Sequence, residues 1–165
     1  MKKLLFSVIL GVAVFANISA QDTNSTSADV LSKGSWIIEA NTGSATTGNT
    51  SFAFSSGNID VFSVGVESGY FISDNLAIKI GLGYSSFNSN SNFVYKIGGK
   101  YYINRKFPVG IDFTGVSDGA NWIGIQGGYA WFIANNVSLE PAVRYNAGID
   151  SSNIFQGLIG FVIHL

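Results

Sequence analysis

The residues between 34 and 165 alternate almost everywhere between an apolar side chain and a small or polar one. Leu76, Ile78 and Ile80 share one parity, for example, whereas Ala77 and Lys79 share the other. In a β-strand these two sets point to opposite faces. The pattern recurs in eight segments, and the apolar parity carries no charged residue in any of them. The segments lie near residues 36–41, 62–70, 76–85, 93–103, 107–114, 123–133, 137–145 and 155–165.

Two all-β architectures produce this alternation, and they differ in which face is buried. A soluble sandwich or lipocalin-like barrel would bury the apolar parity, whereas a membrane barrel turns it toward lipid. Only 12% of the residues are charged, and Gly, Ala and Ser dominate the polar parity, which is unlike a water-facing surface. Most of the segments are about 9–11 residues long, enough for a tilted strand to cross a bilayer. Aromatic residues near the segment ends are typical of an interfacial girdle: Tyr70, Tyr84, Phe93, Tyr101, Phe107, Trp131, Tyr145 and Phe155.

The connections between the segments alternate between short and long. Residues 73–75, 104–106 and 134–136 are tight and rich in turn-forming residues, whereas 42–58, 86–92, 116–121 and 147–153 are longer and polar. Three short turns and four long loops suit eight strands whose two ends lie on the same side. The sequence therefore predicts an eight-stranded, antiparallel, up-and-down transmembrane β-barrel over residues 34–165.

The N-terminus has the pattern of a secretory signal peptide. Lys2 and Lys3 precede an apolar run over residues 4–16, and a small residue, Ala20, ends the segment. A membrane-spanning helix is the alternative, but it needs about 20 apolar residues. We therefore expect residues 1–20 to be a signal peptide and the polar residues 21–33 to form a flexible N-terminal arm.

Four acidic and four basic residues lie on the polar parity. Glu67 should face Lys79 across one tight hairpin, Lys100 should face Asp112 across the next, and Gln126 should lie near Arg144. Unpaired charges in so narrow a lumen are costly, so we expect the eight residues to pair and plug the barrel; a gated small-solute pathway and acid–base catalysis are weaker alternatives. The predicted network is Glu39, Glu67, Lys79, Lys96, Lys100, Asp112, Glu140 and Arg144.

Other candidate sites are weaker. The single histidine, His164, should lie at the rim on the short-turn side, the wrong end for the Ser–His acyl-transfer chemistry of barrel enzymes. Gly98–Gly99 and Gly127–Gly128 match no phosphate-binding loop. The first long loop, over residues 42–57, could contact a ligand or another cell. With no cysteine and near-neutral charge, we expect no catalytic site, metal, cofactor or nucleic-acid partner.

Two segments, GYFISDNLAI at residues 69–78 and WFIANNVSLEP at 131–141, resemble the small outer-membrane β-barrels of Gram-negative bacteria, the OmpA transmembrane-domain and OmpX-like barrels, especially those of Bacteroidota. The resemblance implies a monomer in the bacterial outer membrane that contacts lipid and lipopolysaccharide and has a structural or surface-interaction role. It also implies an assembly signal at Gly160, Ile163 and Leu165, read by the barrel-assembly machinery. Leu158 and Leu165 depart from the usual polar residue and terminal Phe of that signal.

Overall fold

The computed structural model of the chain describes residues 29–42, 51–55, 61–87, 90–117 and 119–165. The predicted signal peptide and residues 21–28 of the predicted arm lie outside this part. Nearly all of the described residues are in strands, and no helix among them is long and apolar enough to cross a membrane. The elements are the 3₁₀-helix η1 (Asp29–Leu31) and the strands β1 (Trp36–Thr42), β2 (Ser51–Ser55), β3 (Val61–Ser73), β4 (Leu76–Phe87), β5 (Asn90–Ile103), β6 (Phe107–Val116), β7 (Asn121–Gly128), β8 (Trp131–Ala134), β9 (Val137–Gly148) and β10 (Ile154–His164).

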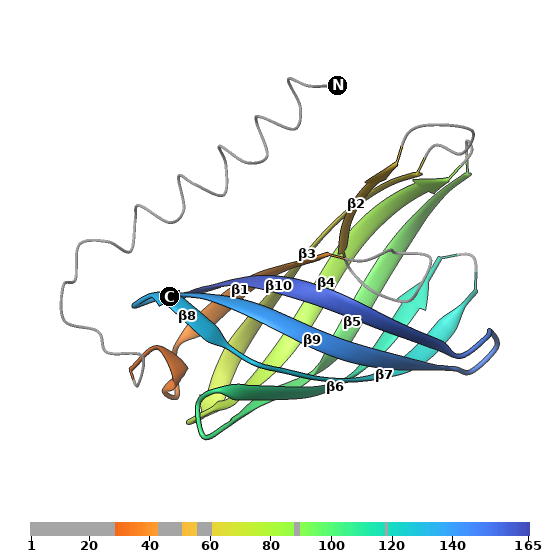
Figure 1. Cartoon of the computed structure of the whole chain (residues 1–165). Coiled ribbons are helices and arrows are strands. Elements are labelled where there is room, and N and C mark those ends of the chain that lie inside the picture. Colours follow the sequence, from red (N-terminus) through yellow and green to blue (C-terminus); the bar gives the residue numbers. More distant parts are fainter. Residues whose placement is uncertain (1–28, 43–50, 56–60, 88–89, 118) are drawn as a thin grey trace.

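The strands close into a barrel (Figure 1). Strands β3 to β7 pair antiparallel with their neighbours in chain order, β9 pairs with both β7 and β10, and β10 returns to pair with β1. The closing ladder runs from Ile37 opposite His164 to Asn41 opposite Gly160. β1 and β2 both pair with the same edge of β3, one after the other, and β7 and β8 pair in the same way with β9. Each of these two pairs therefore counts as one strand of the wall, which has eight strands, as predicted.

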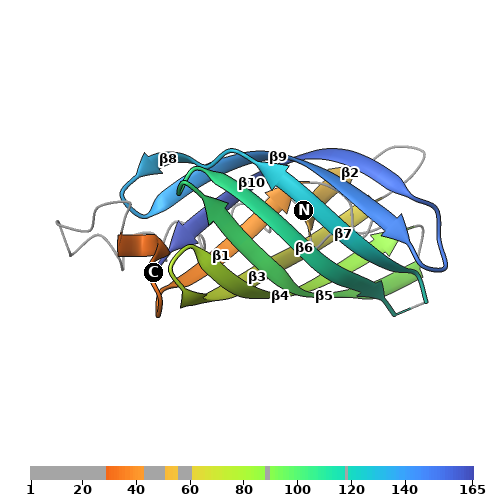
Figure 2. The same ribbon diagram turned by 90° about the horizontal axis from the view of Figure 1, so that it is seen from below.

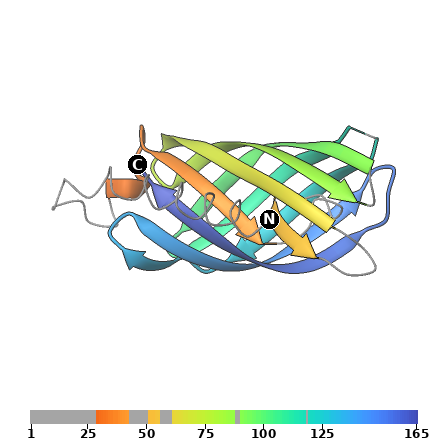
Figure 3. The same cartoon turned by 90° about the horizontal axis from the view of Figure 1, so that it is seen from above.

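The strand β2 lies inside the stretch that the sequence indicated as the first long loop. β1 pairs with the half of β3 nearest the short turns, and β2 pairs with the other half, through Ala53 opposite Ser63 to Ser55 opposite Val61. Figure 3 shows β2 continuing the direction of β1 along this edge. β2 alternates between phenylalanine and small residues, but five residues within a long polar stretch are too few to indicate a strand by themselves.

Two other connections differ from the expectation. The predicted loop over residues 86–92 is mostly ladder, since β4 and β5 stay paired as far as Phe87 opposite Asn90. The predicted segment 123–133 is interrupted between β7 and β8, where the Tyr129 amide donates to the Pro141 carbonyl. Proline has no N–H to return that bond, so the ladder is broken at this point.

The short turns gather at one end of the barrel, which we call the short-turn end. Residues 74–75, 104–106 and 135–136 make these turns. Asn75 and Asn104 have positive φ angles of 65° and 50°, which asparagine tolerates better than most residues. The chain enters β1 and leaves β10 at the same end (Figure 2).

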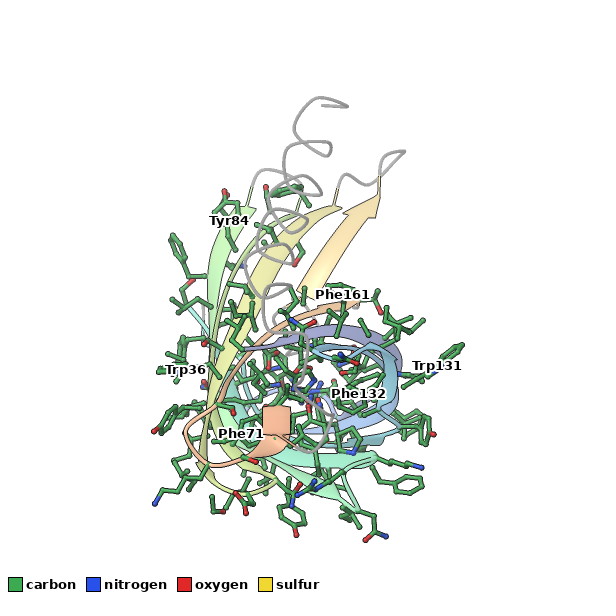
Figure 4. The ribbon with its side chains drawn as sticks, turned by 90° about the vertical axis from the view of Figure 1, so that its left-hand side faces the viewer. Trp36, Phe71, Tyr84, Trp131, Phe132 and Phe161 are labelled. Atoms are coloured by element: carbon green, nitrogen blue, oxygen red, sulfur yellow. The ribbon has the colours of Figure 1, made fainter. Side chains whose placement is uncertain are left out.

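The apolar parity faces outward and the polar parity faces the lumen. Leu82 and Phe155 are 69% and 71% exposed, whereas Glu39 and Arg144 are 1% and 0% exposed. Viewed from the short-turn end, Trp36, Tyr84 and Trp131 point away from the barrel (Figure 4). This distribution is the reverse of a soluble fold, in which the large apolar side chains are inside.

Next to the short turns, the lumen holds a small apolar core. Phe71, Tyr102 and Val162 line it from the wall, and Val30 and Leu31 of η1 enter it from the end. Backbone bonds hold this segment, because Leu31 O accepts from Asn75 N (2.8 Å) and Gly34 N donates to Phe71 O (2.9 Å). Residues 29–33, the last part of the predicted arm, are thus attached to the barrel.

Candidate functional site

The middle of the lumen contains a chain of six charged side chains of alternating sign, which we call the ion chain. Its members come from β1, β3, β4, β5 and β9, and each is less than 7% exposed. They meet because every one lies on the inward parity of its strand, about halfway along the barrel. In order, the ion chain is Lys96, Glu67, Lys79, Glu39, Lys100 and Glu140.

Each inner member of the ion chain contacts two partners of opposite charge. Lys79 Nζ lies 2.6 Å from Glu39 Oε2 and 2.7 Å from Glu67 Oε2. Lys100 Nζ lies 2.8 Å from Glu39 Oε2 and 2.5 Å from Glu140 Oε2, and Lys96 Nζ lies 2.6 Å from Glu67 Oε1. Three ammonium groups balance three carboxylates, so the ion chain is neutral as a whole.

Asp112 and Arg144 form a separate ion pair. Arg144 Nη1 and Nη2 each donate to one oxygen of Asp112, both at 2.6 Å. Such a two-pronged contact fixes both planar groups. Gln126 lies opposite Arg144 in the β7–β9 register, and its Oε1 accepts from Nη1 at 3.2 Å. Thr114 Oγ1 donates to Asp112 Oδ1 at 2.9 Å.

The glycines of the polar parity make room for these side chains. A Cβ atom on Gly124 would lie 1.9 Å from Arg144 Nη2, and one on Gly98 would lie 2.4 Å from Asp112 Cβ. A Cβ atom on Gly160 would lie 2.9 Å from the side-chain oxygen of Asn41. The small residues that distinguished this parity in the sequence therefore leave the space that the charged side chains occupy.

The predicted contacts are only partly those observed. Glu67 and Lys79 lie together, and Gln126 contacts Arg144, because both pairs belong to neighbouring strands. Lys100 contacts Glu39 and Glu140 rather than Asp112, although β5 and β6 are neighbours. The expected Lys100–Asp112 pair does not form because Arg144 reaches Asp112 from β9, while Lys100 extends across the lumen to β1 and β9.

Tyr102, Ser138 and His164 extend the ion chain toward the short-turn end, and the sequence analysis missed their connection to it. Tyr102 Oη and Ser138 Oγ both donate to Glu140 Oε1, at 2.9 and 3.0 Å. His164 Nε2 lies 3.1 Å from Ser138 Oγ. All three residues lie on the inward parity, so the alternation could have included them if uncharged polar residues had been counted.

We expected His164 to hold a rim position at the short-turn end, with no catalytic role. It lies at the short-turn end, where its amide donates to Asn136 O, but its side chain is fully buried and stacks at 5.2 Å from the Phe132 ring. Since Ser138 donates its proton to Glu140, the histidine donates from Nε2 to Ser138. The serine proton therefore points away from the imidazole, and this pair is not arranged as a nucleophile and its base.

The three residues of the expected assembly signal have different surroundings. Gly160 faces the lumen against Asn41, Ile163 is 3% exposed, and Leu165 is 48% exposed. The backbone of Leu165 exchanges two hydrogen bonds with Trp36, at 2.8 and 2.9 Å. This end of the chain therefore closes the barrel against the start of β1.

The middle of the lumen has little free space around the ion chain. The cavity among the ion chain, Asp112 and Gln126 has a volume of about 10 Å³ available to the centre of a water molecule, which is at the lower limit for one water. Gly98–Gly99 and Gly127–Gly128 lie within β5 and β7, not in a phosphate-binding loop. No three His, Cys, Asp or Glu side chains group as metal ligands among the residues that the structure describes.

Two solved structures share this architecture. The N-terminal β-barrel domain of Pseudomonas aeruginosa OprF superposes with a TM-score of 0.54 at 12% identity, covering 81% of this chain and 98% of that one. The de novo designed barrel TMB2.3, solved by NMR, superposes with a TM-score of 0.52 at 16% identity, covering 81% and 96%. No protein-family model and no curated protein matches the sequence. At these identities the likeness establishes the fold: a small eight-stranded barrel of the outer-membrane type.

Proposed function

We propose that this chain is an outer-membrane β-barrel with a structural or surface-interaction role, whose lumen is plugged by ion pairs. The exposed apolar belt supports a position in a bilayer, since a soluble protein would not leave Leu82, Phe93 and Phe155 so exposed. The likeness to the OprF barrel domain supports the outer membrane. In this proposal residues 1–20 direct export, and the barrel-assembly machinery inserts the chain as a monomer.

The observation that carries the proposal is the closed ion chain in the middle of the lumen. A conducting pore needs a continuous water-filled path, whereas here six charged side chains contact one another directly and leave about 10 Å³ between them. Replacing any member with a neutral residue leaves the buried ion chain with a net charge that no partner balances, which destabilises the folded barrel. The arrangement therefore supports a plug.

We propose no enzymatic activity for the barrel. The one Ser–His contact that could suggest it, between Ser138 and His164, is fully buried and has the serine proton directed to Glu140. Val30 and Leu31 fill the neighbouring end of the lumen. A substrate would have to displace this apolar core to reach the hydroxyl.

Two measurements test the proposal. The chain should resist SDS in the cold and change its gel mobility on heating, because a closed barrel in which every strand is paired unfolds only at high temperature. In planar bilayers it should show no steady conductance. The double variant Glu39→Ala, Lys100→Ala should show its mobility shift at a lower temperature than the wild type, because it removes two side chains from the middle of the ion chain. Leu82→Ala, on the outer face, is the matched control and should shift near the wild-type temperature.

The outcomes separate the alternatives. A chain that fractionates without detergent and shows no heat-dependent mobility would be a soluble binding protein, and the membrane proposal would be wrong. A heat-modifiable barrel with steady wild-type conductance would instead be a narrow solute channel.

A further inference from the structure

A basic hollow lies on the outside of the barrel at the short-turn end. It has a volume of about 430 Å³, and the turn between β5 and β6 forms one side of it, while the break between β7 and β8 forms the other. The two sides are tied together by the Ala130 amide, which donates to Lys106 O at 2.7 Å. The lining residues are Asn104, Arg105, Lys106, Tyr129, Ala130, Trp131 and Phe132.

The two cations of this hollow have no ion pair among the residues that the structure describes. Every cation of the lumen has a carboxylate within 2.8 Å, but no described acid lies within salt-bridge distance of Arg105 or Lys106, and both are exposed. The third exposed cation of the described chain, Lys33, is at the same end but outside the hollow. The hollow itself therefore presents two cations without a described ion partner, while Asp74 is exposed in the turn between β3 and β4 at the same end.

Exposed aromatic rings line the same hollow as the two cations. Trp131 is 61% exposed and points away from the wall, as Figure 4 shows. Tyr129 is 43% exposed and packs edge-on against Phe107, with ring centres 5.6 Å apart. Tryptophan and tyrosine prefer the boundary between lipid headgroups and acyl chains, so the cations lie where headgroup phosphates would be.

We propose that this hollow binds the headgroup of an anionic glycerophospholipid. This inference rests on the proposed membrane location. A guanidinium can hold a phosphate through two parallel bonds and an ammonium adds a point charge, while the exposed Trp131 and Tyr129 rings pack along the upper acyl chains. A zwitterionic headgroup is a poorer fit, because its own cation would face Arg105 and Lys106.

The test is a competition between lipids for the refolded chain. The protein is placed in phosphatidylcholine bilayers that contain a minor fraction of phosphatidylglycerol, and quenching of tryptophan fluorescence is compared when one or the other lipid carries brominated chains. Subtracting the signal of Trp131→Phe isolates the reporter beside the hollow. We expect phosphatidylglycerol to be enriched at Trp131 by about 30-fold, the combined effect of two cations at a bilayer surface.

Charge variants locate the binding. Arg105→Gln and Lys106→Gln should each reduce the enrichment severalfold, and the double variant should abolish it. Lys33→Gln removes one charge from the same end but outside the hollow, and should leave the enrichment unchanged. Equal reduction by Lys33→Gln, or a preference for the phosphates of lipid A over phosphatidylglycerol, would overturn the assignment.

A failure of this inference is distinguishable from a failure of the proposed function. If the chain shows the heat-dependent mobility of a barrel but wild-type Trp131 reports no phosphatidylglycerol enrichment, only the lipid site is wrong. If the mobility shift is absent, the membrane location itself is wrong.

Discussion

The lumen is filled in two different ways along its length, and the contrast shows how a narrow barrel can be closed. The middle holds the ion chain, in which every buried charge depends on named partners. The short-turn end holds an apolar core, in which Leu31 and Phe71 make apolar contacts that need no specific partner or bond geometry. Removing one member of the ion chain leaves a net charge in the buried lumen, and the desolvation of that charge is no longer compensated. An apolar core loses stability in proportion to the volume removed. The two regions should therefore respond differently to single substitutions.

The largest effect is expected in the middle of the ion chain. Glu39→Gln removes the carboxylate that Lys79 and Lys100 share, so the variant should lose about 3–5 kcal/mol of stability. The midpoint of urea unfolding in lipid vesicles measures this, with tryptophan fluorescence as the probe. Asp150→Asn, an exposed charge in the last loop, should change stability by less than about 0.5 kcal/mol. Equal effects of the two variants would show that the ion chain does not hold the barrel together.

A smaller effect is expected in the apolar core. Leu31→Ala leaves a cavity beneath η1 and should cost about 2–3 kcal/mol, whereas Leu31→Met keeps the volume and should cost less than about 1.5 kcal/mol. The same urea titration measures both variants. If alanine at this position cost no more than methionine, η1 would not be packed into the barrel in solution.

The glycines beside the ion pairs provide a matched test within one strand. Gly124→Ala places a Cβ against the guanidinium of Arg144 and should cost about 1–3 kcal/mol. Gly127→Ala, three residues further along β7, meets nothing within 4 Å and should be close to neutral. Thermal unfolding by circular dichroism compares the two variants. A neutral Gly124→Ala would mean that the Arg144–Asp112 pair moves without cost.

The smallest effect is expected at the basic hollow. The double variant Arg105→Gln, Lys106→Gln removes two exposed cations that form no ion pair with any residue that the structure describes. It should change stability by less than about 0.5 kcal/mol in neutral bilayers. Urea unfolding in phosphatidylcholine alone is the measurement. A clear loss of stability there would point to a structural role for these cations, independent of any lipid.

Much of this molecule could be predicted from the alternation alone. Because the side-chain period of a strand is two, the parity of Lys79 or Leu82 decides at once whether it faces the lumen or the outside. The tight hairpins bring neighbouring strands into register, so the Glu67–Lys79 contact followed from local spacing. The outward orientation of the apolar side chains followed from composition, since a face of small residues with few charges is unlike a water-facing surface.

Only the tertiary structure determined the contacts across the lumen and at its short-turn end. Glu39, Lys100 and Glu140 come from β1, β5 and β9, and their meeting depends on the diameter of the closed barrel and the tilt of its strands, which no local pattern encodes. The burial of His164 and the docking of Val30 and Leu31 depend on the same closure. Local periodicity determines which way each side chain points; the distance between opposite walls determines what it meets there.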